Sequence, residues 1–189
     1  MTNAPNPAVV DTDTLSGEMR PVRRAALALG SNLGDRLDTM QAGLNVLTES
    51  AGIVTVAISS VYETEAVGGP ADNPPFLNAV LVIDTTLGPR ALLERSLSTE
   101  DAFGRSREVP DGPRTLDVDV LAVGDRQVED DDLRVPHPRL SERAFVLVPW
   151  AEVDPTFEIP GLGTVLQVRN QVSDSTVRRL RDAELELPA

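Results

Sequence analysis

The chain contains no cysteine and no lysine, and His137 is the only histidine among its 189 residues. Without cysteine, disulfides, thiolate metal sites and thiol nucleophiles are excluded. Without lysine, a Walker A phosphate-binding loop is excluded, because that loop needs its lysine. A single histidine excludes zinc sites that are built on two or three imidazole ligands. All 17 basic residues are therefore arginines.

Long apolar runs and a positive net charge are also missing. The longest apolar runs, AALAL and AFVLVPWA, are shorter than the roughly 18 residues of a membrane span. The first 20 residues lack the charged-then-apolar pattern of a signal peptide. The net charge of −13 argues against nucleic-acid or anionic-membrane partners, although a few arginines can still create a local site for a small anion. We therefore expect a cytoplasmic monomer that binds neither nucleic acid nor membrane.

The chain divides into three regions by composition. Residues 1–20 contain Pro, Asn, Thr and Asp with little periodicity, which predicts a disordered tail. Residues 21–172 are long enough for one globular domain with a sizeable core. Residues 173–189 are charged, and their pattern leaves their structure open.

The folded region shows alternating strand and helix patterns. We expect strands at 25–29, 53–65, 76–87 and 115–125 and helices at 35–49 and 89–105, with Asp35 as a cap or first-turn anion and Pro89 in the first turn of its helix. A further helix begins near Ser141 and ends at Pro149, and a weaker helical element covers 164–172. This order predicts an α+β protein with a ferredoxin-like βαββαβ antiparallel sheet, helices on one face, and C-terminal additions.

Two aspartates stand inside the apolar run GPRTLDVDVL, residues 112–121. Strand interiors rarely contain Asp, and a buried carboxylate is costly unless it is paired or binds metal. Because side chains alternate along a strand, Asp117 and Asp119 share one face, with their Cα atoms roughly 6.5–7 Å apart. The opposite, buried face takes Leu116, Val118, Val120 and Ala122.

Carboxylates at this spacing can hold Mg²⁺, although a solvated sheet face with two exposed acids is the alternative. The loop before this strand carries Arg105, Arg107 and Arg114. Their planar guanidinium groups suit phosphate oxygens, whereas surface solubility would explain any single one of them. Carboxylate-held Mg²⁺ beside arginines is typical of phosphoryl transfer.

The motif GPRTLDVDVL resembles the signature of the 6-hydroxymethyl-7,8-dihydropterin pyrophosphokinase family of folate biosynthesis. Further similar motifs follow the same order over about residues 25–154: LALGSNLGDR, SSVYETEAVG, FLNAVL, AFGRSR and VPHPRLSERAFVLVPW. The resemblance implies that pyrophosphate passes from ATP to the hydroxymethyl oxygen of the pterin and that AMP is released. It also implies two Mg²⁺ ions that hold the triphosphate.

The resemblance assigns a role to each matching residue. Asp117 and Asp119 correspond to the metal ligands, and the catalytic arginines that meet the phosphates correspond to Arg105, Arg107 and Arg114. The rest of the ATP side corresponds to Glu100, His137 and Arg143, and the pterin side to Phe76 and Phe145 as stacking rings, Asn78 at the ring edge, and the loop from Thr64 to Val67. Without the resemblance, the sequence around His137 favours a capping or packed histidine. Gly30 and Ser31 fit either a position under the pocket or a tight turn.

Two other classes of function remain open at this stage. A ferredoxin-like module could bind a nucleotide without turnover. A nucleotidyl transferase could also use two strand carboxylates, but it would release pyrophosphate. Incubation with ATP, Mg²⁺ and the pterin distinguishes both from the pyrophosphokinase, which yields AMP and a pterin diphosphate.

Overall fold

The computed structural model describes residues 21–66, 70, 72–104 and 112–188. The predicted disordered tail at residues 1–20 lies outside these residues. Within the described ranges, no helix is long and apolar enough to cross a membrane.

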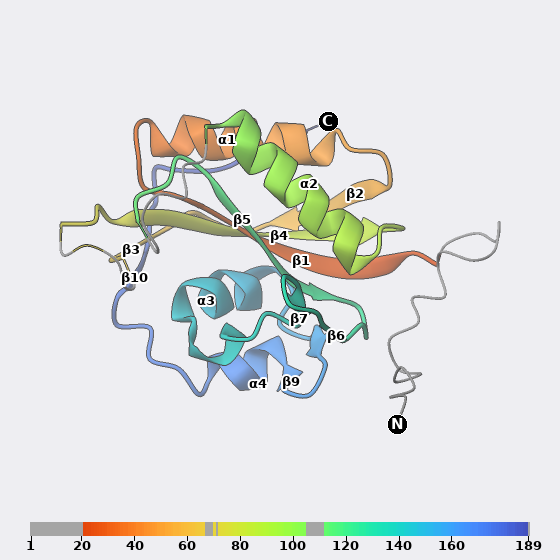
Figure 1. The fold of residues 1–189 in the computed structure, drawn as a ribbon. Coiled ribbons are helices and arrows are strands. Elements are labelled where there is room, and N and C mark those ends of the chain that lie inside the picture. The colour runs from red at the N-terminus through yellow and green to blue at the C-terminus, as the bar shows by residue number, and fades with distance from the viewer. Residues whose placement is uncertain (1–20, 67–69, 71, 105–111, 189) are drawn as a thin grey trace, which may run out of the picture.

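A six-stranded antiparallel sheet forms the centre of the molecule (Figure 1). Its strands lie in the order β10-β3-β4-β1-β5, and β2 pairs with the other half of β4. The strands are β1 (Arg23–Ser31), β2 (Ile53–Ile58), β3 (Tyr62–Thr64), β4 (Phe76–Thr85), β5 (Asp117–Val123) and β10 (Val177–Arg179). With helices α1 (Arg36–Thr48) and α2 (Pro89–Ala102), this confirms the predicted βαββαβ order.

The predicted starts of α1 and α2 are confirmed by local chemistry. Asp35 caps α1, and its side chain accepts a hydrogen bond from the backbone N–H of Asp38 at 3.3 Å. Pro89 is the first residue of α2, where its missing N–H costs nothing.

The predicted single strand over 53–65 is interrupted, and this prediction was wrong in its continuity. Ser59 occupies the interruption, where its Oγ accepts a hydrogen bond from the N–H of Val80 at 2.9 Å. Ser60 donates to Glu152 through both its N–H, at 3.1 Å, and its Oγ, at 2.7 Å. These bonds replace part of the strand ladder, so β2 ends at Ile58 and β3 begins at Tyr62.

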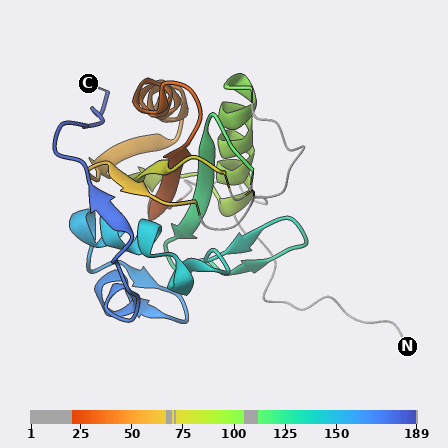
Figure 2. The same ribbon diagram turned by 90° about the vertical axis from the view of Figure 1, so that its left-hand side faces the viewer.

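The sheet buries a separate apolar cluster on each face. Helices α1 and α2 cover one face, as predicted, and bury Leu44, Leu47 and Leu92 with strand residues such as Leu27. The C-terminal additions cover the other face through α3 (Ala144–Val153) and α4 (Val165–Arg169) (Figures 1 and 2). The domain therefore has three layers, with the sheet in the middle.

Helix α3 departs from its predicted limits. Ser141 lies in the short 3₁₀ turn η3 (Leu140–Glu142) and does not cap the helix, which begins at Ala144 and continues through Pro149 to Val153. A proline inside a helix costs about 3 kcal/mol. Burial of three neighbours, Val146, Leu147 and Trp150, offsets that cost, since a fully buried apolar side chain contributes about 1.5–3 kcal/mol.

Strand β5 contains an irregularity that the simple alternation did not predict. Ala26 pairs with Ala122 while Leu27 pairs with Val120, so Leu121 is an extra residue in the ladder. Leu121 and Ala122 consequently both face the cluster under α3. The prediction that Ala122 shares a face with Val118 and Val120 was wrong, because a bulge shifts the alternation.

The remaining elements lie after β5. Two short hairpins are formed by β6 (Val128–Glu129) with β7 (Arg134–Val135) and by β8 (Glu158–Ile159) with β9 (Gly163–Thr164). Thr164 caps α4 with a reciprocal capping box to Gln167, within the predicted element at 164–172. Figure 2 shows β10, in blue, at the edge of the sheet, where it pairs with β3.

Candidate active site

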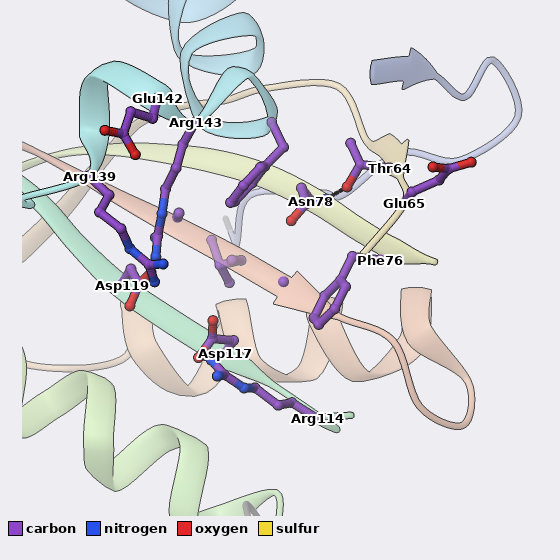
Figure 3. A pocket seen from close by; sticks show the side chains of 14 residues that line it. Thr64, Glu65, Phe76, Asn78, Arg114, Asp117, Asp119, Arg139, Glu142 and Arg143 are labelled. Carbon is purple, nitrogen blue, oxygen red and sulfur yellow. Dashed lines mark hydrogen bonds and ion pairs between the residues drawn. The ribbon is translucent and has the colours of Figure 1, made fainter. Parts of the chain in front are cut away.

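A pocket of about 220 Å³ opens beside the N-terminal end of α3 (Figure 3). The pairing of β1 with its two neighbours, β4 and β5, determines which residues form the floor of the pocket. Gly30 pairs with Asn78 on one side and with Asp117 on the other, and Ala28 pairs with Asp119. Small residues in the middle of the row therefore leave space between polar side chains on the two flanking strands.

Gly30 lines this pocket and has no positive φ, so the pocket explanation holds for it and the tight-turn explanation does not. A Cβ atom at this position would lie 3.4 Å from Oδ1 of Asn78 and 3.7 Å from the ring of Phe76. The neighbouring Ser31 is fully buried and does not line the pocket. The absence of a side chain at Gly30 thus gives a ligand access to the amide of Asn78.

Each of the two aspartates meets an arginine. The guanidinium of Arg114 donates to Oδ1 of Asp117 at 2.8 Å, and that of Arg143 donates to Oδ2 of Asp119 at 2.6 Å. Figure 3 shows both carboxylates and both arginines on one side of the pocket. The sequence prediction that Asp117 and Asp119 share a face is confirmed.

Asn32 holds the loop that presents Arg114. Its Oδ1 accepts the N–H of Arg114 at 2.6 Å, and its Nδ2 donates to Oδ1 of Asn73 at 2.7 Å and to the carbonyl of Pro74 at 3.0 Å. The side chain is almost fully buried. Asn32 therefore joins the loops before β4 and β5, a role that sequence reasoning missed although the residue lies in the quoted motif LALGSNLGDR.

The opposite side of the pocket is less charged. The amide Nδ2 of Asn78 donates to Oγ1 of Thr64 at 2.8 Å, and both side chains are more than 90% buried. Phe76 and Phe145 line the same pocket, and the guanidinium of Arg143 lies 5.5 Å from the centroid of the Phe145 ring. The structure thus brings together four of the five residues predicted on the pterin side.

His137 lies next to the carboxylates but does not line the pocket itself. Its Nε2 is 3.9 Å from Oδ2 of Asp119, and its Nδ1 accepts the N–H of Arg139 at 3.2 Å. Burial is the main cause that lowers the pKa of His137 below its ordinary value, and Arg143 lowers it further against the opposing effect of Asp119. The imidazole is therefore favoured in its neutral form.

Glu100 lies away from the pocket, between α2 and β5. Its Oε1 accepts the N–H of Val118 at 2.8 Å, and the residue is 1% exposed. The geometry gives Glu100 a contact with the strand that carries the two aspartates. Three other predicted site residues, Arg105, Arg107 and Val67, lie outside the described residues.

Sequence reasoning missed two charged residues that line the pocket, Arg139 and Glu142, whereas Glu65 lies in the predicted loop from Thr64 to Val67. Arg139 and Glu142 belong to the quoted motif VPHPRLSERAFVLVPW, in which only His137, Arg143 and Phe145 received roles. A spacing rule could have found Arg139, since it precedes Arg143 by one helical turn. That rule assumes an α-helix, and the segment between these two arginines is a 3₁₀ turn instead.

The two aspartates have the chemistry of a magnesium site. Among the described residues, no group of three or more His, Cys, Asp and Glu side chains could hold a metal ion. Asp117 and Asp119 offer hard oxygen ligands from one strand face, and both remain partly exposed to the pocket. Mg²⁺ is commonly held by one or two carboxylates together with substrate phosphates and water. The pair therefore fits Mg²⁺ that arrives with a phosphate ligand.

Comparison with known sequences identifies similar proteins. The sequence model of the family described as 7,8-dihydro-6-hydroxymethylpterin-pyrophosphokinase (HPPK) matches residues 26–155. The 2-amino-4-hydroxy-6-hydroxymethyldihydropteridine pyrophosphokinase of Methylorubrum extorquens is 45% identical over 157 residues, which cover 83% of this chain and 98% of the relative. The Bacillus subtilis protein of the same name is 44% identical over 129 residues, covering 68% of this chain and 77% of the relative.

Solved structures show the same fold. The crystal structure of wild-type Plasmodium falciparum HPPK-DHPS with pteroate matches with a TM-score of 0.61 and 16% sequence identity. The match covers 82% of this chain and 43% of the solved chain. This chain thus spans less than half of that solved protein, and the likeness concerns the fold alone.

Proposed function

The chain belongs to the 7,8-dihydro-6-hydroxymethylpterin-pyrophosphokinase family, and we propose that the pocket beside α3 is where its reaction takes place. The chain is an ATP-dependent enzyme of folate biosynthesis that transfers pyrophosphate from ATP to the hydroxymethyl group of 6-hydroxymethyl-7,8-dihydropterin. The transfer joins the hydroxymethyl oxygen to the β-phosphorus and releases AMP.

The observation that carries this proposal is the row of paired residues across the three central strands. Asn78, Gly30 and Asp117 are direct neighbours in the sheet register. A flat pterin ring over Gly30 would meet the amide of Asn78 at its edge and the rings of Phe76 and Phe145 nearby. Its hydroxymethyl group would then point to the carboxylate side, where the triphosphate would bind.

On the phosphate side, the arginines bind phosphate and the carboxylates bind metal. Arg114 and Arg143 bind phosphate oxygens and offset their charge, for which the planar guanidinium is well suited. Asp117 and Asp119 would hold Mg²⁺, with two ions expected. When bound, the metal would offset the charge that develops on the phosphates during transfer. Neutral His137 beside Asp119 is available as a hydrogen-bond donor to the nucleotide.

Five further predicted residues complete the proposed site. Arg105 and Arg107, with Arg114, would contact the transferred phosphates. Glu100 would contribute to the ATP side by supporting β5 at Val118. Thr64 and Val67 would bound the pterin, Thr64 through the side chain that also contacts Asn78.

We further propose that residues 21–172 carry the whole catalytic site, since every described residue that lines the pocket falls within them. The segment 173–189 would support β3 through β10. We propose that a monomer is active, since residues of a single chain line the pocket. Since the reaction consumes ATP, the cytoplasm is the proposed location.

The test is a product analysis with the full chain, ATP, Mg²⁺ and 6-hydroxymethyl-7,8-dihydropterin. We expect AMP and a pterin diphosphate in equal amounts, and no AMP when the pterin is omitted. Release of free pyrophosphate would indicate a nucleotidyl transferase instead. Binding of ATP without any product would indicate a nucleotide-binding module.

A further inference from the structure

Three arginines line the described part of the pocket, and they differ in their ion pairs. Arg114 is paired with Asp117 and Arg143 with Asp119. For Arg139, no ion pair with any carboxylate is found among the described residues. Figure 3 shows its side chain extending into the pocket beside Arg143, at the level of Asp119. This end of the pocket thus holds two guanidinium groups near Asp119, and Glu142 is a second carboxylate in its lining.

The backbone that carries Arg139 is fixed on both sides. Two residues before it, the N–H of His137 donates to the carbonyl of Leu121 at 2.9 Å and joins the turn to β5. One residue after it, Leu140 is fully buried under α3. The N–H of Arg139 itself donates to Nδ1 of His137 at 3.2 Å. The anchored turn therefore fixes the backbone position from which the exposed side chain of Arg139 reaches the pocket.

We infer that Arg139 is an ATP-binding residue that contacts the phosphates without first giving up an ion pair. The inference rests on the proposed function, because it assigns a residue to the nucleotide side of that site. Arg114 and Arg143 must exchange a carboxylate for a phosphate when ATP and metal bind. Among the described residues, Arg139 has no carboxylate partner to exchange, so its charge is available to an incoming anion. Electrostatic attraction of this kind raises both the association rate and the affinity.

Arg139 also permits a cleaner experiment than its two neighbours. Replacing Arg114 or Arg143 would leave a carboxylate without its partner, which mixes a loss of phosphate binding with a change at the metal ligands. Replacing Arg139 breaks no ion pair in the described part of the chain. Arg139→Gln is therefore expected to keep the unfolding midpoint of the parent chain.

The test is calorimetric titration of the full chain with a non-hydrolysable ATP analogue and Mg²⁺, and separately with the pterin. Arg139→Gln removes charge-assisted hydrogen bonds to phosphate oxygens, so it should weaken analogue binding by about tenfold or more. Pterin binding should stay within about twofold. Arg139→Lys should restore part of the affinity, because a point charge replaces the planar fork. The matched control is Arg134→Gln, an exposed arginine on β7 outside the pocket.

The inference would be overturned if Arg139→Gln binds the analogue within about twofold of the parent chain. Equal losses for the analogue and the pterin would overturn it as well, since they would indicate a structural role. An equal loss of analogue affinity in Arg134→Gln would show only a general charge effect. These outcomes are read from binding alone, whereas failure of the proposed function would appear as absent AMP and pterin diphosphate in the parent chain.

Discussion

The side-chain amide of Asn78 donates a 2.8 Å hydrogen bond to the hydroxyl of Thr64, although the two residues belong to different strands. Thr64 pairs with Phe76 in the ladder, so the bond crosses the sheet diagonally. It uses one of the two amide donors and fixes which way the amide points. Oδ1 of Asn78 is left on the Gly30 side, where a ligand can reach it.

Replacement of Asn78 by Ala should weaken binding of the pterin much more than binding of the nucleotide. A site built to hydrogen-bond its ligand loses much affinity when the partner is removed, so pterin binding should weaken about 100-fold. Affinity for an ATP analogue with Mg²⁺ should change less than about threefold. Calorimetry with each ligand measures this. Thr64→Ser keeps the hydroxyl and serves as the control, and equal losses for both ligands in Asn78→Ala would contradict the division of the pocket.

The two aspartates should be needed for activity and not for folding. Asp117→Asn and Asp119→Asn each remove a charged metal ligand at a partly exposed position, so turnover should fall by about a hundredfold or more while the unfolding midpoint shifts little. Product formation and thermal unfolding are measured in parallel. Asp131→Asn, at an exposed site outside the pocket, is the control. Near-normal turnover in both variants would rule out the metal assignment.

Glu63 should couple the C-terminal strand to the pocket wall. It forms ion pairs with Arg178 of β10 and, at 3.1 Å, with Arg36, which also donates to the carbonyl of Pro75 at 2.8 Å. Burial raises the pKa of Glu63, but the bonds from Arg178 and Arg36 outweigh burial and hold the pKa below its ordinary value. Glu63→Gln should therefore cost about 1 kcal/mol of unfolding free energy at neutral pH.

The pH dependence of this loss follows from the direction of the shift. The lowered pKa of Glu63 stabilises the folded state at pH values above the ordinary pKa of 4.5. This stabilisation is lost as the pH falls below that value and through the pKa of the folded state. Urea unfolding should thus give a lower free energy of unfolding for Glu63→Gln than for the parent chain at neutral pH, and this difference should disappear in acid. Glu129→Gln, at an exposed site, should unfold with the same free energy as the parent chain. A difference for Glu63→Gln that persists unchanged in acid would contradict the role of the ion pairs.

Tyr62 offers a direct spectroscopic check, because it is the only tyrosine in the chain. Burial, and then the nearby charge of Glu152, raises the pKa of Tyr62 to about 12. Between the ordinary pKa of about 10 and this value, the unfolded chain has lost the proton that the folded chain keeps. The free energy of unfolding should therefore decrease as the pH rises through this range.

The ultraviolet absorbance of tyrosinate measures this titration in the folded and in the urea-unfolded chain. Glu152→Gln should lower the pKa of Tyr62 only partway, since burial is the larger cause. Tyr62→Phe should remove the corresponding slope of stability with pH. A folded chain that titrates at the ordinary tyrosine value would show that the phenol is exposed in solution.

Local patterns predicted much of the fold. Asp35 and Pro89 marked helix starts correctly because capping and the missing proline N–H act within one turn. The alternation of side chains along a strand correctly placed Asp117 and Asp119 on one face, because it too depends only on near neighbours in the chain. The failures occurred where distant residues intervene: Glu152 interrupts the strand at Ser60, and burial under the sheet carries α3 past Pro149.

The candidate site shows the same limit. The residue types that are available follow from the sequence, with arginine as the only strong cation and two carboxylates on one strand. Folding then selects which arginine meets which carboxylate, places Glu100 behind β5, and brings Arg139 into the pocket. These depend on strand register and loop anchoring between residues far apart in the chain. A shift of one residue in the pairing of β1 would turn Gly30 away from the pocket and close it.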